Sequence, residues 1–208
     1  TSPTVISANA LTCITGAIGA AGASDVVATT GAFTPTLVGG YTYLDGWTDT
    51  AIPSAPSARN SHTAVWTGSE MIIWGGGAGV ATGARFNPVT NAWTATTATS
   101  APTARLSHTA VWTGSEMIIW GGLSAASVAQ NDGGIYNPIA DSWAAVVTTS
   151  APAIRYLHTA VWTGSDMIVW GGYNGSTYLS SGARYNRAAS TWTALAAAPA
   201  GVAARFYH

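Results

Sequence analysis

The pattern of apolar and polar positions along the chain predicts short β-strands joined by tight turns. Residues 62–67 are rich in β-branched and aromatic side chains and are followed by the turn pair Gly68-Ser69. Residues 71–74 form a continuous apolar run that ends at two glycines. The shortness of this run and its β-branched content favour a strand over a buried helix, and its lack of alternation predicts that both faces are covered. Two more strands are predicted, at residues 83–87 and from Trp93 onward, and the hairpin-length turns make neighbouring strands antiparallel.

This pattern recurs along the chain at a nearly constant interval. The segment 62–76 returns unchanged at 108–122 and, with two conservative exchanges, at 158–172. In each copy an Arg lies three residues before the His, an Ala-Pro pair precedes that Arg, and an aromatic residue followed by Asn lies seven residues before a Trp. The spacing of 46 and then 50 residues between the histidines indicates a repeat architecture. Four-stranded sheets that are buried on both faces and repeated in series are what the blades of a β-propeller require.

The Arg-x-x-His start, the Gly-Gly pair after the second strand, the aromatic residue of the third strand and the Trp of the fourth together resemble the kelch repeat. The resemblance is strongest to bacterial repeats that carry His-Thr-Ala-Val-Trp-Thr-Gly, and it extends over residues 55–208. It implies an all-β fold of kelch-like β-propeller blades, each a four-stranded antiparallel meander, in a partial or small ring. It implies little about activity, because kelch propellers serve as scaffolds, adhesive modules and, less often, enzymes.

The repeat landmarks divide the chain into five segments. Residues 1–54 are expected to hold a degenerate N-terminal blade and an extended segment, with Tyr41–Leu44 and Trp47 in its third and fourth strands. Three full blades follow at 55–100, 101–150 and 151–197, and residues 198–208 begin a further blade or supply a ring-closing strand. Because the sequence stops as a new first strand begins, three hypotheses stay open: a mixed blade that closes a small ring, an open edge that pairs with a second molecule, and a fragment of a longer chain.

Charged residues are scarce in this sequence. Only 7% of the 208 residues are charged, the formal net charge is −1, and all seven basic residues are Arg. Such a surface provides little electrostatic steering, so nucleic acid and anionic membranes are not expected partners. The apolar stretch 10–23 is shorter than the roughly 20 residues that span a bilayer, so no membrane span is predicted. The N-terminus fits a mature secreted chain, which predicts an extracellular or cell-surface protein.

The repeated polar residues form a ring in the predicted propeller. They are the Arg-x-x-His pairs of successive blades: Arg59 and His62, Arg105 and His108, Arg155 and His158, Arg205 and His208. Converging histidines could bind a metal, but a wide ring would hold the imidazoles too far apart, so a structural interpretation is favoured. In that interpretation the His bonds a backbone carbonyl, the Arg bonds a neighbouring carboxylate or carbonyl, and the pair holds blade to blade. Cys13, the single cysteine, has no zinc or haem spacing around it, so no metal and no cofactor are predicted.

Two further repeated features also receive structural interpretations. An acid follows the Gly-Ser turn in every blade, and it could pair with an Arg of the ring: Glu70, Glu116 and Asp166. One acid per hairpin is typically a solvated or turn-forming residue, so no catalytic residue is assigned. Of the ten Trp residues, nine occupy three repeat positions and are interpreted as blade-to-blade packing rather than as a platform for sugars.

Variable segments lie between the second and third strands, at residues 77–82, 123–132 and 173–181. Insertions at one equivalent site mark one face of a repeat protein, often the face that binds. Tyr173, Asn174 and Tyr178 are the residues of these segments that are expected to hold a ligand.

The expected function is a secreted structural or binding module that assembles with itself through its open edge. The expected partners are a second copy of the chain, or a cell-surface protein or glycan. Two alternatives stay open: a carbohydrate-active or metal-dependent enzyme domain at the channel mouth, and a protein-recognition propeller that uses the loops after the second strands.

Overall fold

The computed structural model describes residues 54–77 and 80–196 and, nearer the N-terminus, the backbone of four strands. These four strands are β1 (Thr4–Ser7), β2 (Ala10–Thr12), β3 (Gly22–Val27) and β4 (Thr36–Tyr43). The chain divides into two compact units, Thr1–Thr50 and Ala51–His208.

In the unit Thr1–Thr50, β1 pairs with β2 and β3 pairs with β4, each as a two-stranded antiparallel sheet. The strand predicted at Tyr41–Leu44 overlaps the end of β4, where Tyr41 and Tyr43 pair with Ser24 and Gly22. Several sequence predictions concern residues outside the described ones: Cys13, Trp47, Arg205, His208 and the whole of 198–208.

The unit Ala51–His208 contains three four-stranded sheets, one for each full repeat. The first blade consists of β5 (Thr63–Trp66), β6 (Met71–Trp74), β7 (Gly83–Asn87) and β8 (Ala92–Ala95). The second consists of β10 (Thr109–Trp112), β11 (Met117–Trp120), β13 (Gly133–Asn137) and β14 (Ser142–Ala145). The third consists of β15 (Thr159–Trp162), β16 (Asp166–Trp170), β17 (Gly182–Asn186) and β18 (Thr191–Ala194).

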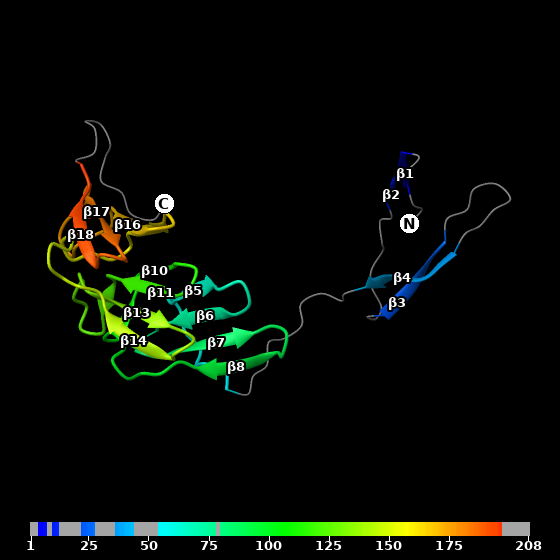
Figure 1. Cartoon of the computed structure of the whole chain (residues 1–208), viewed down its shortest axis with the longest axis horizontal. Coiled ribbons are helices and arrows are strands. Elements are labelled where there is room, and N and C mark those ends of the chain that lie inside the picture. The colour runs from blue at the N-terminus through cyan, green and yellow to red at the C-terminus, as the bar shows by residue number, and fades with distance from the viewer. Residues whose placement is uncertain are drawn as a thin grey trace. The chain divides into compact units, whose positions relative to one another are not determined.

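Within each of these sheets the strands are neighbours in chain order, and every pairing is antiparallel. No helix occurs among the described residues, so the predicted all-β fold of four-stranded antiparallel blades is confirmed. The second and third strands of the first blade occupy the predicted ranges, whereas its first strand begins one residue later, at Thr63. Figure 1 shows the three sheets as an open series that does not close into a barrel.

The tight turns are fixed by side chains that accept backbone hydrogen bonds. In the first hairpin of the first blade, Thr67 Oγ1 accepts from the N–H groups of Ser69 and Glu70 at 3.2 and 2.9 Å. Between the third and fourth strands, Asn87 Oδ1 accepts from the N–H groups of Val89 and Thr90 at 2.9 and 3.1 Å. The second blade repeats both arrangements. Asn is suited to such turns because its short side chain reaches the backbone two and three residues ahead, which explains the aromatic-Asn pair of every repeat.

The segment before each first strand crosses the loop between the second and third strands of the same blade. In the second blade this segment forms β9 (Arg105–Leu106), which pairs with β12 (Leu123–Ser124). In the third blade the equivalent contact is a bridge between Tyr156 and Tyr173. The long loop of each of these two blades is therefore held against the repeat segment.

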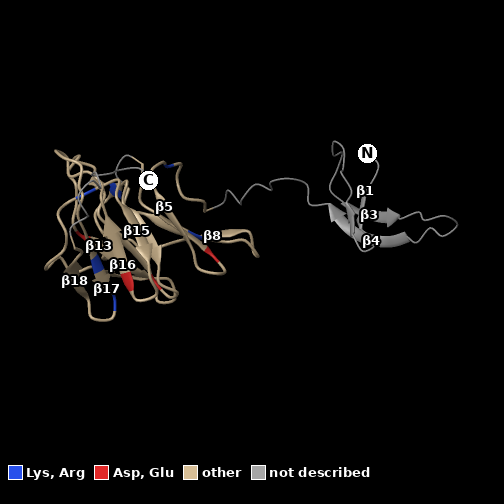
Figure 2. Cartoon of the chain, turned by 90° about the horizontal axis from the view of Figure 1, so that it is seen from above, with Lys and Arg blue, Asp and Glu red and all other residues tan. Residues whose placement is uncertain are grey.

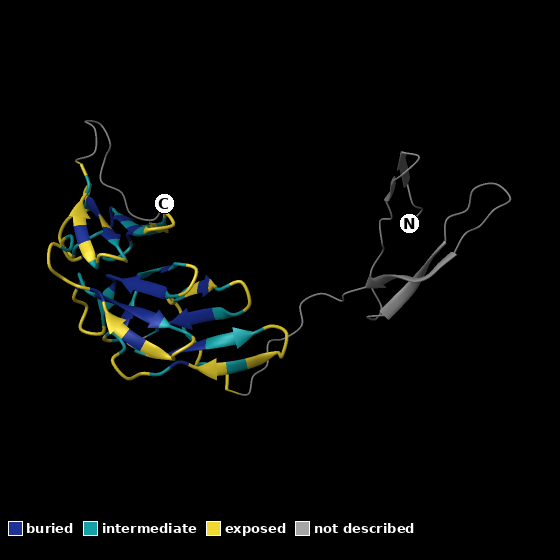
Figure 3. Cartoon of the chain, in the orientation of Figure 1, coloured by how far each residue is buried: buried dark blue, intermediate teal, exposed yellow. Residues whose placement is uncertain are grey.

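The hydrophobic core lies between the blades. Along β11, Met117 and Ile119 pack in a cluster shared with the first blade, whereas Ile118 and Trp120 pack in a cluster shared with the third. All four side chains are buried, which confirms for this blade that both faces of the second strand are covered (Figure 3). In the third blade Met167 and Val169 are buried towards the second blade, and the alternate residues of β16 are only half-buried.

Tryptophans join the blades, as the repeat positions predict. Trp74 of the first blade lies 5.5 Å from Trp143 of the second, and Trp120 of the second lies 5.2 Å from Trp192 of the third, measured between ring centroids. The indole N–H of Trp143 donates to the Thr97 carbonyl at 3.0 Å, so its one polar group is satisfied across the border. The equivalent bond runs from Trp192 to Val147 at 2.9 Å. Each border therefore buries two large rings and still pairs the N–H of the fourth-strand Trp.

Candidate functional site

A histidine of each later blade is inserted into the blade before it. His108 Nε2 lies 2.7 Å from Thr63 Oγ1, and His158 Nε2 lies 2.8 Å from Thr109 Oγ1. Both imidazoles are buried, and each meets a second-strand Trp of the preceding blade edge to face, at centroid distances of 5.4 and 5.3 Å. The predicted backbone-carbonyl partner is wrong, because the partner is a threonine hydroxyl on the preceding blade.

The buried imidazoles are uncharged at neutral pH. Burial, reinforced by the neighbouring arginine, lowers the pKa of His108 and of His158 to about 3. Nδ1 of each ring is buried with no hydrogen-bond partner in the described part of the chain. Because an unpaired buried N–H is the rarer and costlier case, we infer that the proton sits on Nε2 and is donated to the threonine.

The arginine three residues earlier acts on both blades at once. Arg105 is fully buried, and its Nη1 donates to the Gly121 and Asp132 carbonyls, each at 3.0 Å, and to Asp132 Oδ1 at 2.8 Å. Its own backbone carbonyl accepts from Gly76 N–H of the first blade at 2.9 Å. The side chain therefore holds the long loop of its own blade, and the main chain holds the preceding blade.

Arg155 repeats this arrangement in the third blade. Its Nη1 donates to the Gly171 and Ser181 carbonyls at 2.9 and 2.7 Å, and its carbonyl accepts from Gly122 at 2.9 Å. Burial lowers the pKa of Arg155 to about 10, so the guanidinium stays charged at neutral pH. In the first blade Arg59 makes the same carbonyl contacts, to Gly75 and Thr82, but it is only half-buried. His62 is exposed, since no described blade precedes it.

The first glycine of each Gly-Gly pair is required by the inserted histidine. Gly75 has φ +69°, and a Cβ there would lie 2.7 Å from His108 Cε1 and 2.9 Å from the Arg105 carbonyl oxygen. At Gly121 the corresponding distances, to His158 and Arg155, are 2.6 and 2.9 Å. A side chain at either position would displace the ring that joins the blades.

The predicted binding residues of the third-blade loop form an aromatic cluster at the loop end of the blade. Tyr173 lies between Tyr156 and Tyr178, with centroid distances of 5.7 and 5.0 Å, and Tyr178 is 52% exposed. Asn174 has a different role from the two tyrosines. Its Oδ1 accepts from the N–H groups of Ser176 and Thr177, both at 2.8 Å, so it shapes the loop.

The acids of the first hairpins pair with arginines, but not with those of the Arg-x-x-His ring. Glu70 lies 3.5 Å from Arg85 and Asp166 lies 3.7 Å from Arg184, both on third strands of the same blade. The second blade has Ile135 at that position, and Glu116 is paired with Arg187 of the third blade instead. The prediction of pairing with the ring arginines is therefore wrong. Figure 2 shows how few other charges the blades carry.

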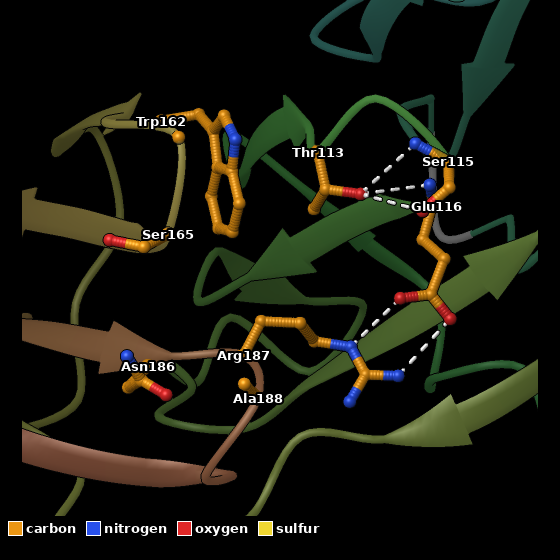
Figure 4. A pocket seen from close by; sticks show the side chains of 9 residues that line it. Thr113, Ser115, Glu116, Trp162, Ser165, Asn186, Arg187 and Ala188 are labelled. Atoms are coloured by element: carbon orange, nitrogen blue, oxygen red, sulfur yellow. Dashed lines mark hydrogen bonds and ion pairs between the residues drawn. The ribbon is translucent and has the colours of Figure 1, made fainter.

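A cleft opens at the hairpin end of each described blade border. Between the second and third blades it has a volume of about 390 Å³ and is lined by Glu116, Ser115, Trp162, Ser165 and Arg187. Figure 4 shows Trp162 on one side, the Glu116 hairpin on the other, and Arg187 reaching beneath both. Arg187 Nε and Nη2 donate to the two Glu116 oxygens at 2.8 and 3.1 Å, which raises the pKa of Arg187.

The cleft between the first and second blades has the same components. Its volume is about 450 Å³, and Trp112, Glu70 and Arg85 take the places of Trp162, Glu116 and Arg187. Arg85 also donates to the Pro138 carbonyl of the second blade at 2.9 Å. We call these two features the hairpin-end clefts.

Neither the clefts nor the junction histidines gather metal ligands. Within residues 54–77 and 80–196, no three His, Cys, Asp or Glu side chains come together as a metal site would require. No helix in the described part of the chain has the length and apolar character needed to cross a membrane.

A profile of the KLHDC2/KLHL20/DRC7 Kelch-repeats domain matches residues 61–208. This chain belongs to the kelch-repeat family. The match covers all three described blades, and it confirms the resemblance that the repeat landmarks indicate. The kelch assignment also indicates a protein-binding propeller, a class that is typically non-enzymatic. A comparison with curated proteins found no match.

Two features of the hairpin-end clefts are not evident from the repeat pattern. The arginines of the hairpin-end clefts, Arg85 and Arg187, are not in phase with one another, so the repeat pattern does not connect them. Trp112 and Trp162 do pack against the blade-border clusters as predicted, but each also lines a cleft. One feature of the sequence indicates the Glu116–Arg187 pair. The second blade has Ile135 where the other two blades have a third-strand Arg, so Glu116 has no such arginine in its own blade.

The junction glycine provides a first test. Gly121→Ala is expected to lower the free energy of unfolding by about 2 kcal/mol or more, because it adds a clash with His158 to the cost of its φ of +66°. Gly77→Ala is the matched control, with φ +60° and its nearest neighbouring atom at 3.8 Å, and should cost roughly 1 kcal/mol. Urea unfolding measures both, and equal losses would contradict the insertion of His158 against Gly121.

The buried histidines predict a pH dependence of stability. Their pKa is about 3 in the folded protein and about 6.5 in an unfolded chain, so the unfolded state takes up protons that the folded state does not. Their stabilising contribution is complete above about pH 6.5 and falls by about 1.4 kcal/mol per pH unit and histidine as the pH decreases towards 3. Urea unfolding between about pH 7 and pH 5 should show a shallower slope in His158→Gln than in the wild type. A slope in His158→Gln equal to that of the wild type would contradict the burial of an uncharged imidazole at this border.

Proposed function

We propose that this kelch domain is a non-catalytic module that binds a protein through the loop end of its blades, with the third-blade loop as the main contact. The observation that carries this proposal is the cluster of Tyr156, Tyr173 and Tyr178. Tyr178 is 52% exposed, and its ring lies 5.0 Å from Tyr173. Tyrosines are enriched among the residues that dominate protein interfaces, because they bury a large area and lose little rotamer freedom.

The loop is also held in one conformation before any partner binds. Tyr156 and Tyr173 exchange two backbone hydrogen bonds of 3.0 and 2.9 Å, and Leu179 N–H donates to the Gly172 carbonyl at 2.8 Å. The two N–H groups bonded to Asn174 close the loop tip. A preorganised loop loses less conformational entropy on binding than a mobile one, which favours a specific contact.

The second-blade loop adds apolar surface at the same end of the blades. Val128 is 52% exposed, and Ser124 and Val128 close the loop through a backbone hydrogen bond of 2.9 Å. The loop residues Ser124–Ser127 and Gly175–Thr177 are uncharged, so the partner surface that fits both loops is one with few charges.

Self-association through the uncovered blade faces is a second candidate function, supported by Trp66 and Val161. At the border between the first and second blades Trp112, the equivalent of Trp66, packs against the cluster that contains Val65 of the preceding blade's first strand. In the described structure Trp66 is 54% exposed and Val161 is 56% exposed. Val161 of one copy could therefore meet Trp66 of the next in a head-to-tail contact.

We further propose that the module acts outside the cell or at its surface. The support comes from the composition of the sequence, which has no Lys and only 7% charged residues. A cell-surface protein or glycan is the corresponding partner class.

The proposed loop contact predicts that Tyr178→Ala weakens capture of a protein partner at least tenfold, because the most exposed tyrosine of the cluster is removed from the interface. The melting temperature should not change, since the side chain is half exposed. Cross-linking and affinity capture from cells that express the protein measure the effect. Ile139→Ala is the control, because Ile139 is 92% exposed at the opposite, hairpin end. Loss of the partner in the control but not in Tyr178→Ala would contradict the proposal.

Self-association predicts oligomers in light scattering of the purified chain that persist at moderate salt, since few charges are available to screen. Trp66→Glu and Val161→Glu should each return the chain to the monomer by placing a charge in the contact. Val128→Glu, with a similar exposure of 52%, should leave the oligomers unchanged. A wild-type chain that is monomeric at all concentrations would refute this second function.

A further inference from the structure

We propose that the hairpin-end clefts bind a neutral saccharide, with a sugar ring against the tryptophan and its hydroxyl groups on the arginine–glutamate pair. These clefts lie at the ends of the blades opposite the tyrosine cluster, since the first hairpins and the long loops occupy opposite ends of each second strand. The inference is therefore independent of the proposed protein contact.

The tryptophan supplies a flat apolar wall that is already fixed in place. Trp162 packs against the cluster between the second and third blades and at the same time lines the cleft. Its side chain is half-buried, so one part of the indole is held by the core and another faces the opening (Figure 4). The C–H face of a pyranose is the apolar surface of a sugar, and a fixed indole can cover it without a loss of rotamer freedom.

The ion pair supplies donors and acceptors together without a net charge. Arg187 uses Nε and Nη2 on Glu116, which leaves three further N–H groups on the guanidinium and further lone pairs on the carboxylate, and both residues line the cleft. A sugar hydroxyl both donates and accepts, so adjacent hydroxyls can bond both partners of such a pair. Because the two charges compensate each other, the pair offers no net attraction to an anion or to a cation, which favours a neutral polyol.

The remaining polar lining divides into shaping and contacting groups. Thr113 Oγ1 accepts from the Glu116 N–H at 2.9 Å, and Asn186 Oδ1 accepts from the Ala189 N–H at 2.8 Å, so both are engaged in turns. Ser115 and Ser165 are exposed on facing hairpins and line the cleft. Volumes of about 390 and 450 Å³ lie within the range of small-molecule sites and admit a sugar ring.

The recurrence of the cleft points to an oligosaccharide rather than a single sugar. Trp112 stands at the first border where Trp162 stands at the second, and Glu70 with Arg85 replaces Glu116 with Arg187. Two sites of one chemistry on one end of the molecule raise the affinity for a ligand long enough to reach both. Both Arg–Glu pairs are partly exposed, with side-chain exposures between 19% and 34%, so they are accessible to such a ligand.

The test uses the full chain and a panel of neutral oligosaccharides built from glucose, galactose, mannose, xylose and N-acetylglucosamine. Binding is screened on immobilised glycans and measured by isothermal titration and by tryptophan fluorescence with the tightest binder. Trp162→Leu, which keeps apolar contact with the core, and Arg187→Gln should each weaken binding about tenfold. Adding Trp112→Leu to either variant should abolish detectable binding.

Tyr178→Ala is the matched control and should bind the glycan as the wild type does, and the melting temperature of every variant shows whether it is folded. Three outcomes would overturn the proposal: no member of the panel binds, binding is unchanged in both Trp162→Leu and Arg187→Gln, or binding is lost in Tyr178→Ala. Capture of an aromatic or proline-rich peptide at the cleft, with every saccharide failing, would also overturn it. Loss of the protein partner in Tyr178→Ala tests the loop contact alone, so the two proposals fail separately.

Discussion

The second strand of each blade imposes the constraint on which the structure depends. Met117, Ile118, Ile119 and Trp120 are all buried, although a single four-stranded sheet can cover neither face of its own middle strand. The sheet must therefore be placed between two others, and the apolar surface it buries is shared with both neighbours. The packing that stabilises the fold therefore lies between neighbouring blades, because no blade has a complete core by itself.

The polar contacts at the blade borders follow from that packing. Once two sheets are packed together, donors and acceptors buried at the border lose their contact with water, and most of them need a partner on the protein. The His108–Thr63 hydrogen bond, the Arg105 carbonyl bonded to Gly76, and the Trp143 N–H bonded to Thr97 all satisfy this need across one border. The repeat segment therefore contributes three parts to each border: an apolar strand, an inserted histidine ring, and a glycine that leaves space for the histidine of the next blade.

The two ends of the blades differ in chemistry because they differ in construction. At the loop end, the buried arginines hold segments of variable length, so the loop tips can differ in sequence without disrupting the packing between blades. The tyrosine cluster lies at this end. At the hairpin end the turns are short and nearly identical, and their acids require arginine partners. The second blade has Ile135 in place of the third-strand arginine, and Glu116 pairs with Arg187 of the third blade instead. The ion pair that lies within one blade in the first and third repeats therefore joins two blades here. This exchange is what gives the cleft at that border its fixed arginine–glutamate pair.

The strands, their order and their repetition can be predicted from the amino-acid sequence, because alternation, turn residues and a fixed period are local properties of the chain. The sequence predicted the range 71–74 of the first-blade second strand and the role of Trp74, Trp120, Trp143 and Trp192 in joining blades. It did not predict that His108 would meet a threonine hydroxyl, nor which arginine would pair with Glu116. Those partners lie on other blades, about one repeat or more away in the chain, and their proximity depends on how two sheets dock. Which groups become buried, and which remain exposed to form a cleft or a loop surface, was decided only by the tertiary structure, since burial is a property of the assembled blades and not of any one repeat.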